Sequence, residues 1–158
     1  MSDTKRNETQ LICDILGLES LVDEITSSNS PTPTAILGPF HRPSAPLFAL
    51  GSSIVASSPE YAPHLTHFSG RVLSPSGLPV TGAMLDIWHT APNGMYEQQD
   101  AAQPEYNLRG RFTTDSDGRF SLICLRPVAY PIPADGPGGE LLRMLDRSPW
   151  RPAHIHVI

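Results

Sequence analysis

Apolar residues recur at steps of three and four between residues 11 and 25, and this spacing predicts an amphipathic helical segment. The apolar positions are Leu11, Ile12, Ile15, Leu16, Leu18, Leu21, Val22 and Ile25. Gly17 interrupts the series, so we expect two short helices that meet there, with Glu19 and Asp23 on their solvated face. The polar residues 1–10 are expected to be frayed. Such a short helical pair should pack on the rest of the protein or on a partner.

Residues 27–63 form a Ser-, Pro- and Ala-rich connection in which regular helix is not expected. Prolines stand at positions 31, 33, 39, 43, 46, 59 and 63. The apolar and aromatic cluster within this connection is residues 36–42, which either lines a pocket or fastens the connection to the core.

From His67 onward, short apolar runs alternate with turn sequences, which is typical of strands. The runs cover residues 68–73, 79–80, 83–88, 112–114 and 119–125. The turn at residues 115–118 predicts that the last two runs pair as a hairpin. Short strands at regular spacing predict a mainly β protein with an antiparallel β-sandwich core. We therefore expect a helical linker over residues 1–30 and a β-sandwich over residues 31–158.

Composition agrees with this fold class and excludes some functions. The 17 prolines, 12 glycines and 17% charged residues favour a loop-rich β architecture. A net charge of −5 argues against a nucleic-acid partner, which would require a basic surface. Because no apolar run approaches the ~18 residues of a membrane-spanning helix, no membrane partner is expected either. By default we expect a cytoplasmic protein.

The last nine residues carry two histidines at a spacing of two. If this segment is extended, His154 and His156 share one face, while Ile155 and Val157 lie on the other. Two imidazoles placed in this way suit Zn, Cu or Fe. An isolated pair of this kind is more often part of an edge strand with solvated histidines, so other residues must decide between the two interpretations.

Two tyrosines lie in segments that interrupt the strand pattern. Tyr96 follows an Asn-Gly turn, and Tyr130 stands beside Pro131 in the stiff, proline-rich segment 126–133. The ordinary expectation for each is an amphipathic ring at the edge of a loop, with its hydroxyl group in water.

Five motifs, in this order, resemble the intradiol ring-cleavage dioxygenases, non-haem Fe(III) enzymes that open catechols between the two hydroxyl-bearing carbons. The motifs are Leu85-Asp86-Ile87-Trp88, Asn93-Gly94-Met95-Tyr96, residues 108–112, residues 126–133 with Asp135-Gly136-Pro137, and Trp150-Arg151-Pro152-Ala153-His154-Ile155-His156. Within the family, the sequences of these motifs most resemble the hydroxyquinol 1,2-dioxygenase branch, followed by the chlorocatechol and catechol 1,2-dioxygenases.

The resemblance implies one Fe(III) per chain and a set of site residues. It makes Tyr96, Tyr130, His154 and His156 the metal ligands, places Arg151 beside the substrate ring, and makes Leu37, Gly38, Pro39, Phe40, Pro131 and Ile132 pocket-lining residues. Two phenolates favour Fe(III) over Fe(II), and the trivalent ion keeps the phenols ionised.

The implied substrates are O2 and a catechol-type diol. Hydroxyquinol would yield maleylacetate, and catechol would yield cis,cis-muconate. Tyr130 is implied to accept a substrate proton, and Arg151 to stabilise negative charge that develops on the ring.

The resemblance also implies that this chain is a fragment. The family continues with further core strands after the position of His156, so we expect a β-sandwich that is incomplete at its C-terminal end. Residues 1–30 correspond to the remnant of an N-terminal dimerisation region, which implies a homodimer for the full-length form.

Two other interpretations remain. Residues 69–125 also resemble transthyretin-like or carboxypeptidase-regulatory-like β-sandwich modules, which bind partners or act as scaffolds; this likeness does not cover residues 130–133 or the histidine pair. A zinc hydrolase would need an acidic third ligand, for which Glu140 is only an isolated candidate.

Overall fold

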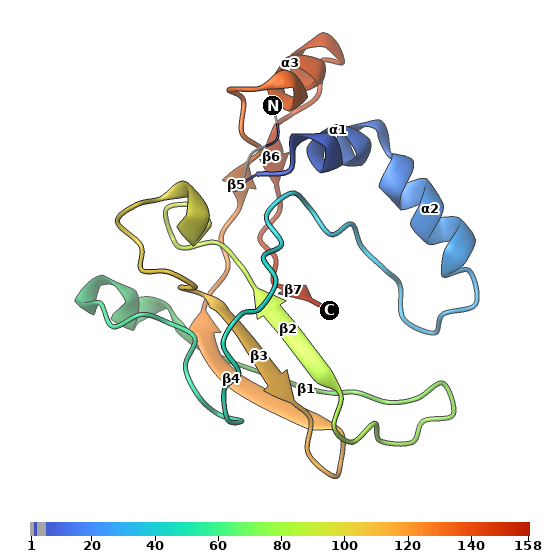
Figure 1. Ribbon diagram of the computed structural model, residues 1–158, viewed down its shortest axis with the longest axis vertical. Coiled ribbons are helices and arrows are strands. Elements are labelled where there is room, and N and C mark those ends of the chain that lie inside the picture. Colours follow the sequence, from blue (N-terminus) through green and yellow to red (C-terminus); the bar gives the residue numbers. More distant parts are fainter. Residues whose placement is uncertain (1, 3–5) are drawn as a thin grey trace. The chain divides into compact units, whose positions relative to one another are not determined.

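The computed structural model describes Ser2 and residues 6–158, and the chain divides into two compact units (Figure 1). Unit 1 comprises Met1–His41 and Tyr130–Pro152, and unit 2 comprises Arg42–Ala129 and Ala153–Ile158. In the described part of the chain, no helix combines the length and the apolar character needed to cross a membrane.

Two helices of unit 1 meet at Gly17, as the apolar spacing predicted. Helix α1 spans Glu8–Leu16 and helix α2 spans Leu18–Thr26. Gly17 has a φ of 77°, in the left-handed region that glycine adopts without strain, and this ends α1. The expectation of a frayed start is wrong for residues 8–10, because the Asn7 side chain accepts a hydrogen bond from the backbone N–H of Gln10 and caps α1. Residues 1 and 3–5 lie outside the described residues.

Helix α1 packs against helix α3, which spans Pro137–Met144. Their shared core consists of Leu11, Ile15 and Leu142, with Ile132 and Leu141 packed against it. A buried carboxylate joins the two helices, since Glu8 Oε1 accepts a hydrogen bond of 2.8 Å from the backbone N–H of Gly138 at the start of α3. This contact satisfies one of the N–H groups that a helix start leaves without a partner inside the helix.

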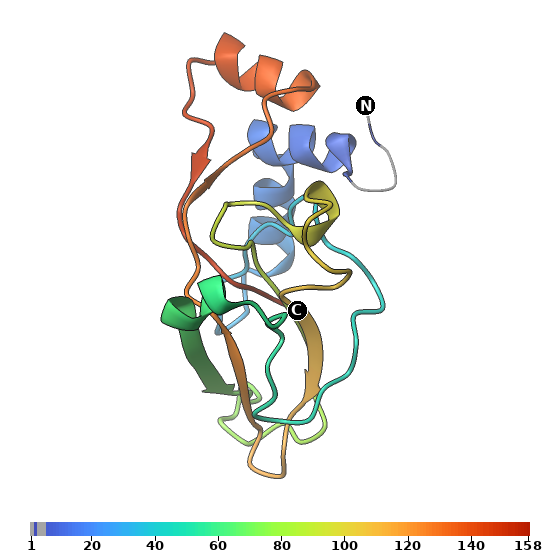
Figure 2. The ribbon, with the colours of Figure 1, turned by 90° about the vertical axis from the view of Figure 1, so that its left-hand side faces the viewer.

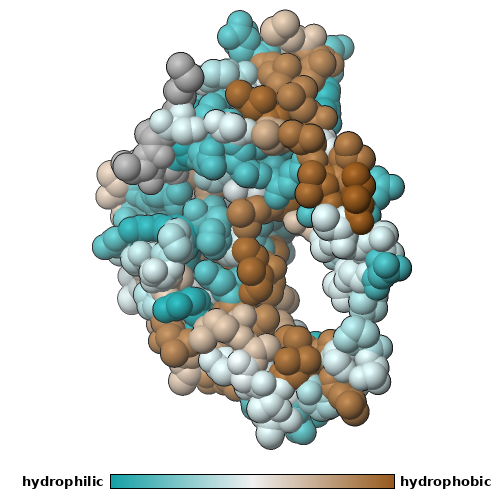
Figure 3. Space-filling model, turned by 45° about the vertical axis from the view of Figure 1, so that its right-hand side comes forward, coloured by the Kyte–Doolittle hydropathy of each residue, from teal (hydrophilic) through white to brown (hydrophobic). Residues whose placement is uncertain are grey.

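Helix α2 behaves differently, because none of its nine residues, all of them described, is buried. Hydrophobic side chains of the helical segment reach the surface (Figure 3), among them Leu21, Val22 and Ile25 of α2. The expectation that the helical pair packs on the rest of the protein is therefore confirmed for α1 only.

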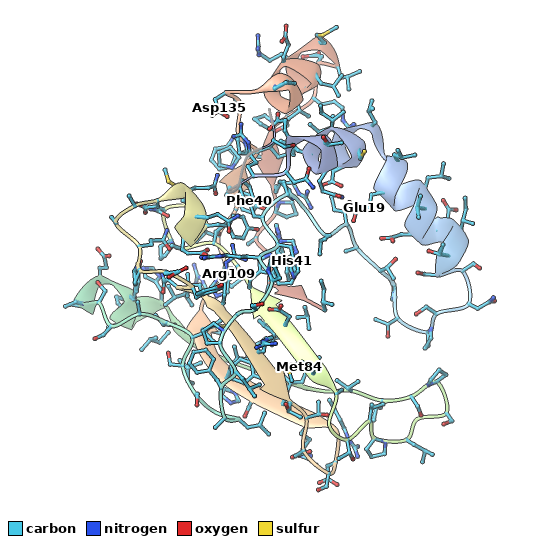
Figure 4. All side chains as sticks on the ribbon, in the orientation of Figure 1. Glu19, Phe40, His41, Met84, Arg109 and Asp135 are labelled. Carbon is cyan, nitrogen blue, oxygen red and sulfur yellow. The ribbon has the colours of Figure 1, made fainter. Side chains whose placement is uncertain are left out.

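Glu19 was expected to be a solvated charge, and this expectation is wrong. Its carboxylate accepts a hydrogen bond of 2.7 Å from the backbone N–H of Leu37 and another from the side-chain amide of Gln10. The physical reason is that a loop N–H group needs an acceptor, which Glu19 supplies. Glu19 thereby fastens residues 36–40 to the helices; Figure 4 labels Glu19 on α2 and Phe40 on this loop.

A short antiparallel ladder closes unit 1. Strand β5 is Tyr130–Pro131 and strand β6 is Trp150–Arg151, with Tyr130 opposite Arg151. The backbone N–H of Ile132 extends the ladder by donating to the Pro149 carbonyl at 2.8 Å.

Unit 2 is an antiparallel β-sandwich, which confirms the predicted fold class. One sheet pairs β1 (Leu65–Arg71) with β4 (Arg119–Leu125), and the other has the order β3-β2-β7, with β2 at Met84–Trp88, β3 at Arg109–Thr113 and β7 at His156–Val157. Two short 3-10 helices, η1 (Pro59–His64) and η2 (Glu97–Gln99), lie in the connections. Figure 2 shows β3 and the β1-β4 pair as separate layers.

The predicted hairpin of residues 112–125 is wrong. Phe112 of β3 lies opposite Leu85 of β2, whereas Leu122 of β4 lies opposite Phe68 of β1, so the turn between β3 and β4 carries the chain from one sheet to the other. The reason is burial: Phe112 and Leu122 belong to one apolar core, which both sheets cover. A hairpin within one sheet would not place these two side chains on opposite layers.

Candidate metal centre

The hydroxyl group of Tyr96 and the imidazoles of His154 and His156 converge in unit 2. Tyr96 Oη lies 3.1 Å from His156 Nε2, and His154 Nε2 lies 3.1 Å from the same nitrogen. The two imidazole planes are 82° apart, which turns both Nε2 atoms toward one place. Ile155, between the histidines, packs against the sandwich core. The predicted division of this segment into a histidine face and an apolar face is therefore confirmed for residues 154–156.

The sheet fixes the position of His156. In the ladder between β2 and β7, His156 is opposite Trp88, and Asp86 exchanges two backbone hydrogen bonds with Ile158, at 2.9 and 3.0 Å. The His156 ring stacks on the Trp88 indole, with centroids 4.5 Å apart and planes 2° from parallel. Trp88 is 1% exposed, so the surface beneath the imidazole is part of the core.

Tyr96 owes its position to the loop between β2 and η2. The backbone turns at Gly94, whose φ is 79°, and the N–H of Ala91 donates to the Met95 carbonyl at 2.9 Å. The N–H of Tyr96 donates to Gln99 Oε1 at 3.0 Å as η2 begins. The ring is 2% exposed, so the expectation of a solvated loop tyrosine is wrong here. The loop returns to the sheet end and buries the ring against it.

The three donor atoms fit a metal ion. Ligands about 2.1 Å from a common ion and at right angles to one another are about 3.0 Å apart, which matches the separations of His156 Nε2 from Tyr96 Oη and His154 Nε2. Two facing Nε2 atoms form at most one hydrogen bond between them, whereas both lone pairs can bind one cation. Imidazole nitrogen suits Zn, Cu, Fe and Ni ions, and a phenolate adds an anionic oxygen donor. Among the described residues, no group of three or more His, Cys, Asp and Glu side chains could hold a metal ion, and the third donor atom of the present cluster is the Tyr96 oxygen.

The other two residues that the resemblance assigned to the reaction, Tyr130 and Arg151, lie in unit 1. They are cross-strand partners in the β5-β6 ladder. Tyr130 is 8% exposed, so it is not an open loop-edge residue, and Arg151 is half-buried. Among the expected pocket residues beside them, Pro131 is exposed, while Ile132 packs against the core that α1 and α3 share.

The expected pocket residues 37–40 also belong to unit 1. Leu37, Gly38 and Pro39 are half-buried and Phe40 is 3% exposed. Two backbone contacts hold the segment: Glu19 accepts from the N–H of Leu37, and the Pro39 carbonyl accepts from the N–H of Asn7 at 3.3 Å. Glu140, the candidate acidic ligand of a zinc hydrolase, is exposed in the first turn of α3.

The sequence reasoning did not identify Trp88 and His89 as parts of this centre. His89 is 2% exposed, and its Nδ1 lies 2.8 Å from the carbonyl of Thr90. Burial lowers the pKa of His89 to about 4, so the imidazole is neutral at physiological pH. Its Nε2 has no hydrogen-bond partner among the residues that the structure describes. The signals in the sequence were the place of Trp88 in the motif Leu85-Asp86-Ile87-Trp88 and the position of both residues at the end of an apolar strand.

A buried ion pair beside Tyr96 was missed as well. Arg109 donates from Nε to Glu97 Oε2 at 2.6 Å, and both side chains are 2% exposed. The arginine lies in strand β3 and the glutamate in η2, twelve positions apart, so no local pattern indicates that they meet.

A β-sandwich that gathers a tyrosine and two histidines at the end of one sheet is a candidate metalloprotein. Comparison with known proteins narrows this class. Residues 50–158 match the family model described as "Dioxygenase", and residues 1–33 match "Catechol dioxygenase N terminus". The chain therefore belongs to the intradiol ring-cleavage dioxygenase family, and the comparisons do not favour the scaffold-module interpretation.

Individual relatives agree with the family. The chain is 48% identical to a catechol 1,2-dioxygenase of Candida albicans, over 99% of this chain and 52% of that protein. It is 42% identical to a hydroxyquinol 1,2-dioxygenase of Rhizobium sp., over 97% of this chain and 52% of that protein. A solved structure of hydroxyquinol 1,2-dioxygenase from Pseudomonas putida DLL-E4 superposes with a TM-score of 0.85 at 44% identity, covering 99% of this chain and 54% of that one. The chain thus spans about half the length of these relatives.

Proposed function

We propose that this chain carries the iron-binding part of an intradiol dioxygenase that opens a catechol-type ring, with catechol or hydroxyquinol as substrate. The observation that supports this most directly is the convergence of Tyr96, His154 and His156 on one place. Relatives named for catechol and for hydroxyquinol support the substrate class without choosing between the two diols.

The residues proposed to hold one ferric ion are Tyr96, Tyr130, His154 and His156. A bound ferric ion would supply a trivalent charge that keeps phenols ionised and attracts the oxygens of a 1,2-diol. His154 and His156 offer Nε2 lone pairs, and the Trp88 indole limits rotation of the His156 ring. His89, held neutral by burial, places no competing positive charge nearby.

The chain's own groups also handle protons and charge in this proposal. Tyr130 as phenolate accepts a proton from a hydroxyl group of the incoming diol. Arg151, its cross-strand partner, stabilises the negative charge that develops on the ring oxygens. The residues proposed to exclude water from the ring are Leu37, Gly38, Pro39, Phe40, Pro131 and Ile132.

The overall reaction balances without a further reductant. The bond between the two hydroxyl-bearing carbons breaks, and both atoms of O2 enter the product, so catechol becomes cis,cis-muconic acid and hydroxyquinol becomes maleylacetate.

For the full-length form we propose a homodimer and a cytoplasmic location. The exposed apolar residues of α2 support self-association.

The test is to load the purified chain with ferric iron and record its visible spectrum before and after anaerobic addition of catechol or hydroxyquinol. A tyrosinate-to-iron band that shifts with the diol, followed on admission of O2 by an acid that is heavier by two oxygen atoms, is the expected result. Resorcinol is the matched control, because its 1,3-hydroxyl groups cannot both reach one ion. A folded protein that takes up no iron, or one whose band ignores the diols, would contradict the proposal.

A further inference from the structure

Beside the Tyr96 ring lies a cluster of charged side chains, of which Glu97 and Arg109 are almost completely removed from water (Figure 4 labels Arg109). Glu97 is the residue that follows Tyr96, and its two carboxylate oxygens accept from two different arginines. Arg109 Nε donates to Oε2 at 2.6 Å and Arg42 Nη1 donates to Oε1 at 3.0 Å. Arg109 also donates from Nη2 to Gln98 Oε1 at 2.6 Å. One guanidinium group thus holds two consecutive residues of η2.

Stability alone is a weak explanation for this cluster. Burying a charged pair costs desolvation energy that the mutual attraction often only offsets, so an apolar pair of similar volume would serve a core as well. A guanidinium offers something an apolar side chain cannot, namely several donors in a rigid planar arrangement. The cluster is therefore better explained by a role in fixing the position of neighbouring groups than by stability alone.

The location of Arg109 indicates which groups it could hold in position. Arg109 lies opposite Trp88 in the β2-β3 ladder, and Trp88 is the residue on which His156 stacks. The guanidinium carbon of Arg109 also lies 5.5 Å from the centroid of the Tyr96 ring. One cross-strand pair of the sheet thus borders two of the converging donors, with the indole beneath His156 and the guanidinium beside Tyr96.

We propose that Arg109 is a positioning residue for Tyr96. It holds Glu97 and Gln98, and so the backbone that carries Tyr96, and its planar cation limits the tilt of the phenol ring. This inference rests on the proposed function, since it concerns Tyr96 as a ligand. It assigns Arg109 no contact with substrate.

The decisive comparison uses Arg109→Lys, which keeps the charge but lacks the planar set of donors that reaches Glu97 and Gln98 together. Gln98→Ala is a milder second variant, which removes one acceptor without leaving a carboxylate unpaired. Arg119→Lys is the matched control, because the Arg119 side chain is 67% exposed on β4 and its nearest acidic oxygen, on Asp117, is 3.8 Å away. Each change is made alone and together with Tyr96→Phe.

The measurements are ferric-iron affinity by competition with a chelator, the position of the visible tyrosinate band, and thermal unfolding of the iron-free protein. Arg109→Lys should weaken iron binding about 10–100-fold and shift the visible band. Gln98→Ala should change the affinity and the band in the same direction, but by less. In the Tyr96→Phe background, neither variant should weaken iron binding further. Arg119→Lys alone should match the wild type, and Arg119→Lys with Tyr96→Phe should match Tyr96→Phe.

The possible failures are separable. If Tyr96→Phe leaves iron binding unchanged, the proposed ligand set fails, and this inference fails with it. If Tyr96→Phe weakens binding but Arg109→Lys and Gln98→Ala do not, only the positioning role is overturned. Lower thermal stability with unchanged affinity and band would reduce Arg109 to a structural residue, and so would losses that add to those of Tyr96→Phe. If Arg109→Lys does not fold, Gln98→Ala decides by the same criteria.

Discussion

The His156 imidazole lies flat on the Trp88 indole, with 4.5 Å between ring centroids and 2° between planes. The indole belongs to strand β2 and is buried in the sandwich, while the imidazole belongs to the short terminal strand β7. A side chain at the end of the chain therefore takes its orientation from the core. This relationship makes the candidate centre sensitive to a residue that contributes no ligand.

Replacing Trp88 should weaken metal binding and stability together. We expect Trp88→Leu to lower ferric-iron affinity about 10-fold, because the surface that orients His156 is lost. The cavity should also lower the free energy of unfolding by about 2 kcal/mol. Trp88→Phe keeps a flat ring and should therefore lose less iron affinity and less unfolding free energy than Trp88→Leu. Chelator competition measures the iron affinity, and urea unfolding measures the stability.

The control is Trp150→Phe, at a side chain that is 62% exposed. Wild-type iron affinity in Trp88→Leu would refute the orienting role of Trp88.

Removing one phenol oxygen should change the colour of the iron-loaded protein. Tyr96→Phe deletes the hydroxyl that lies 3.1 Å from His156 Nε2, and Tyr130→Phe deletes the other proposed tyrosinate. Each should lower iron retention and shift or weaken the visible band, whereas Tyr61→Phe should do neither. Iron content and absorption spectra check this. If both substitutions leave content and spectrum unchanged, neither tyrosine is a ligand.

The carboxyl group of Asp14 should make stability fall as the pH rises. Burial, and then the hydrogen bond and charge of Glu19, raise the pKa of Asp14 from 3.8 to about 7, against opposing contributions from Gln10 and Arg151. The folded protein therefore binds more protons than the unfolded chain between about pH 4 and pH 7. The stabilisation is complete below this range and is lost as the pH rises through about 7.

Asp14→Asn should remove that dependence. Between about pH 5 and pH 8, the wild type should lose more unfolding free energy than the variant, as measured by urea titration at each pH. Glu24→Gln, at an exposed position on α2, is the control and should keep the wild-type slope. A slope in Asp14→Asn equal to that of the wild type would show that this carboxyl group does not hold the proton.

The Glu8 carboxylate should be needed for the packing of α3 on α1. Glu8 is 2% exposed and accepts from the N–H of Gly138 at 2.8 Å, so Glu8→Ala leaves a buried donor without its acceptor. We expect a loss of about 1–3 kcal/mol in the free energy of unfolding. Thr9→Ala, one position along the same helix but exposed, should cost much less. Equal losses in the two variants would argue that only helix propensity had changed.

Much of this protein could be predicted from local patterns in the sequence. The apolar spacing around Gly17 predicted two helices and the residue at which they meet, because a helix face and a left-handed glycine depend on near neighbours. The alternation at residues 154–156 predicted the shared histidine face for the same reason. The motif order indicated the family, and the comparisons confirm it.

Tertiary structure decided what depends on residues far apart in the chain. Nothing local indicated that β3 and β4 would enter different sheets, because burial of Phe112 and Leu122 in one core outweighs the turn between the two strands. The burial of Tyr96 and the Arg109–Glu97 ion pair likewise arise only when the loop folds back on the sheet. The physical reason is that backbone periodicity depends on a few neighbouring residues. The desolvation of a ring or a charge depends instead on residues distant in the sequence that the fold packs against it.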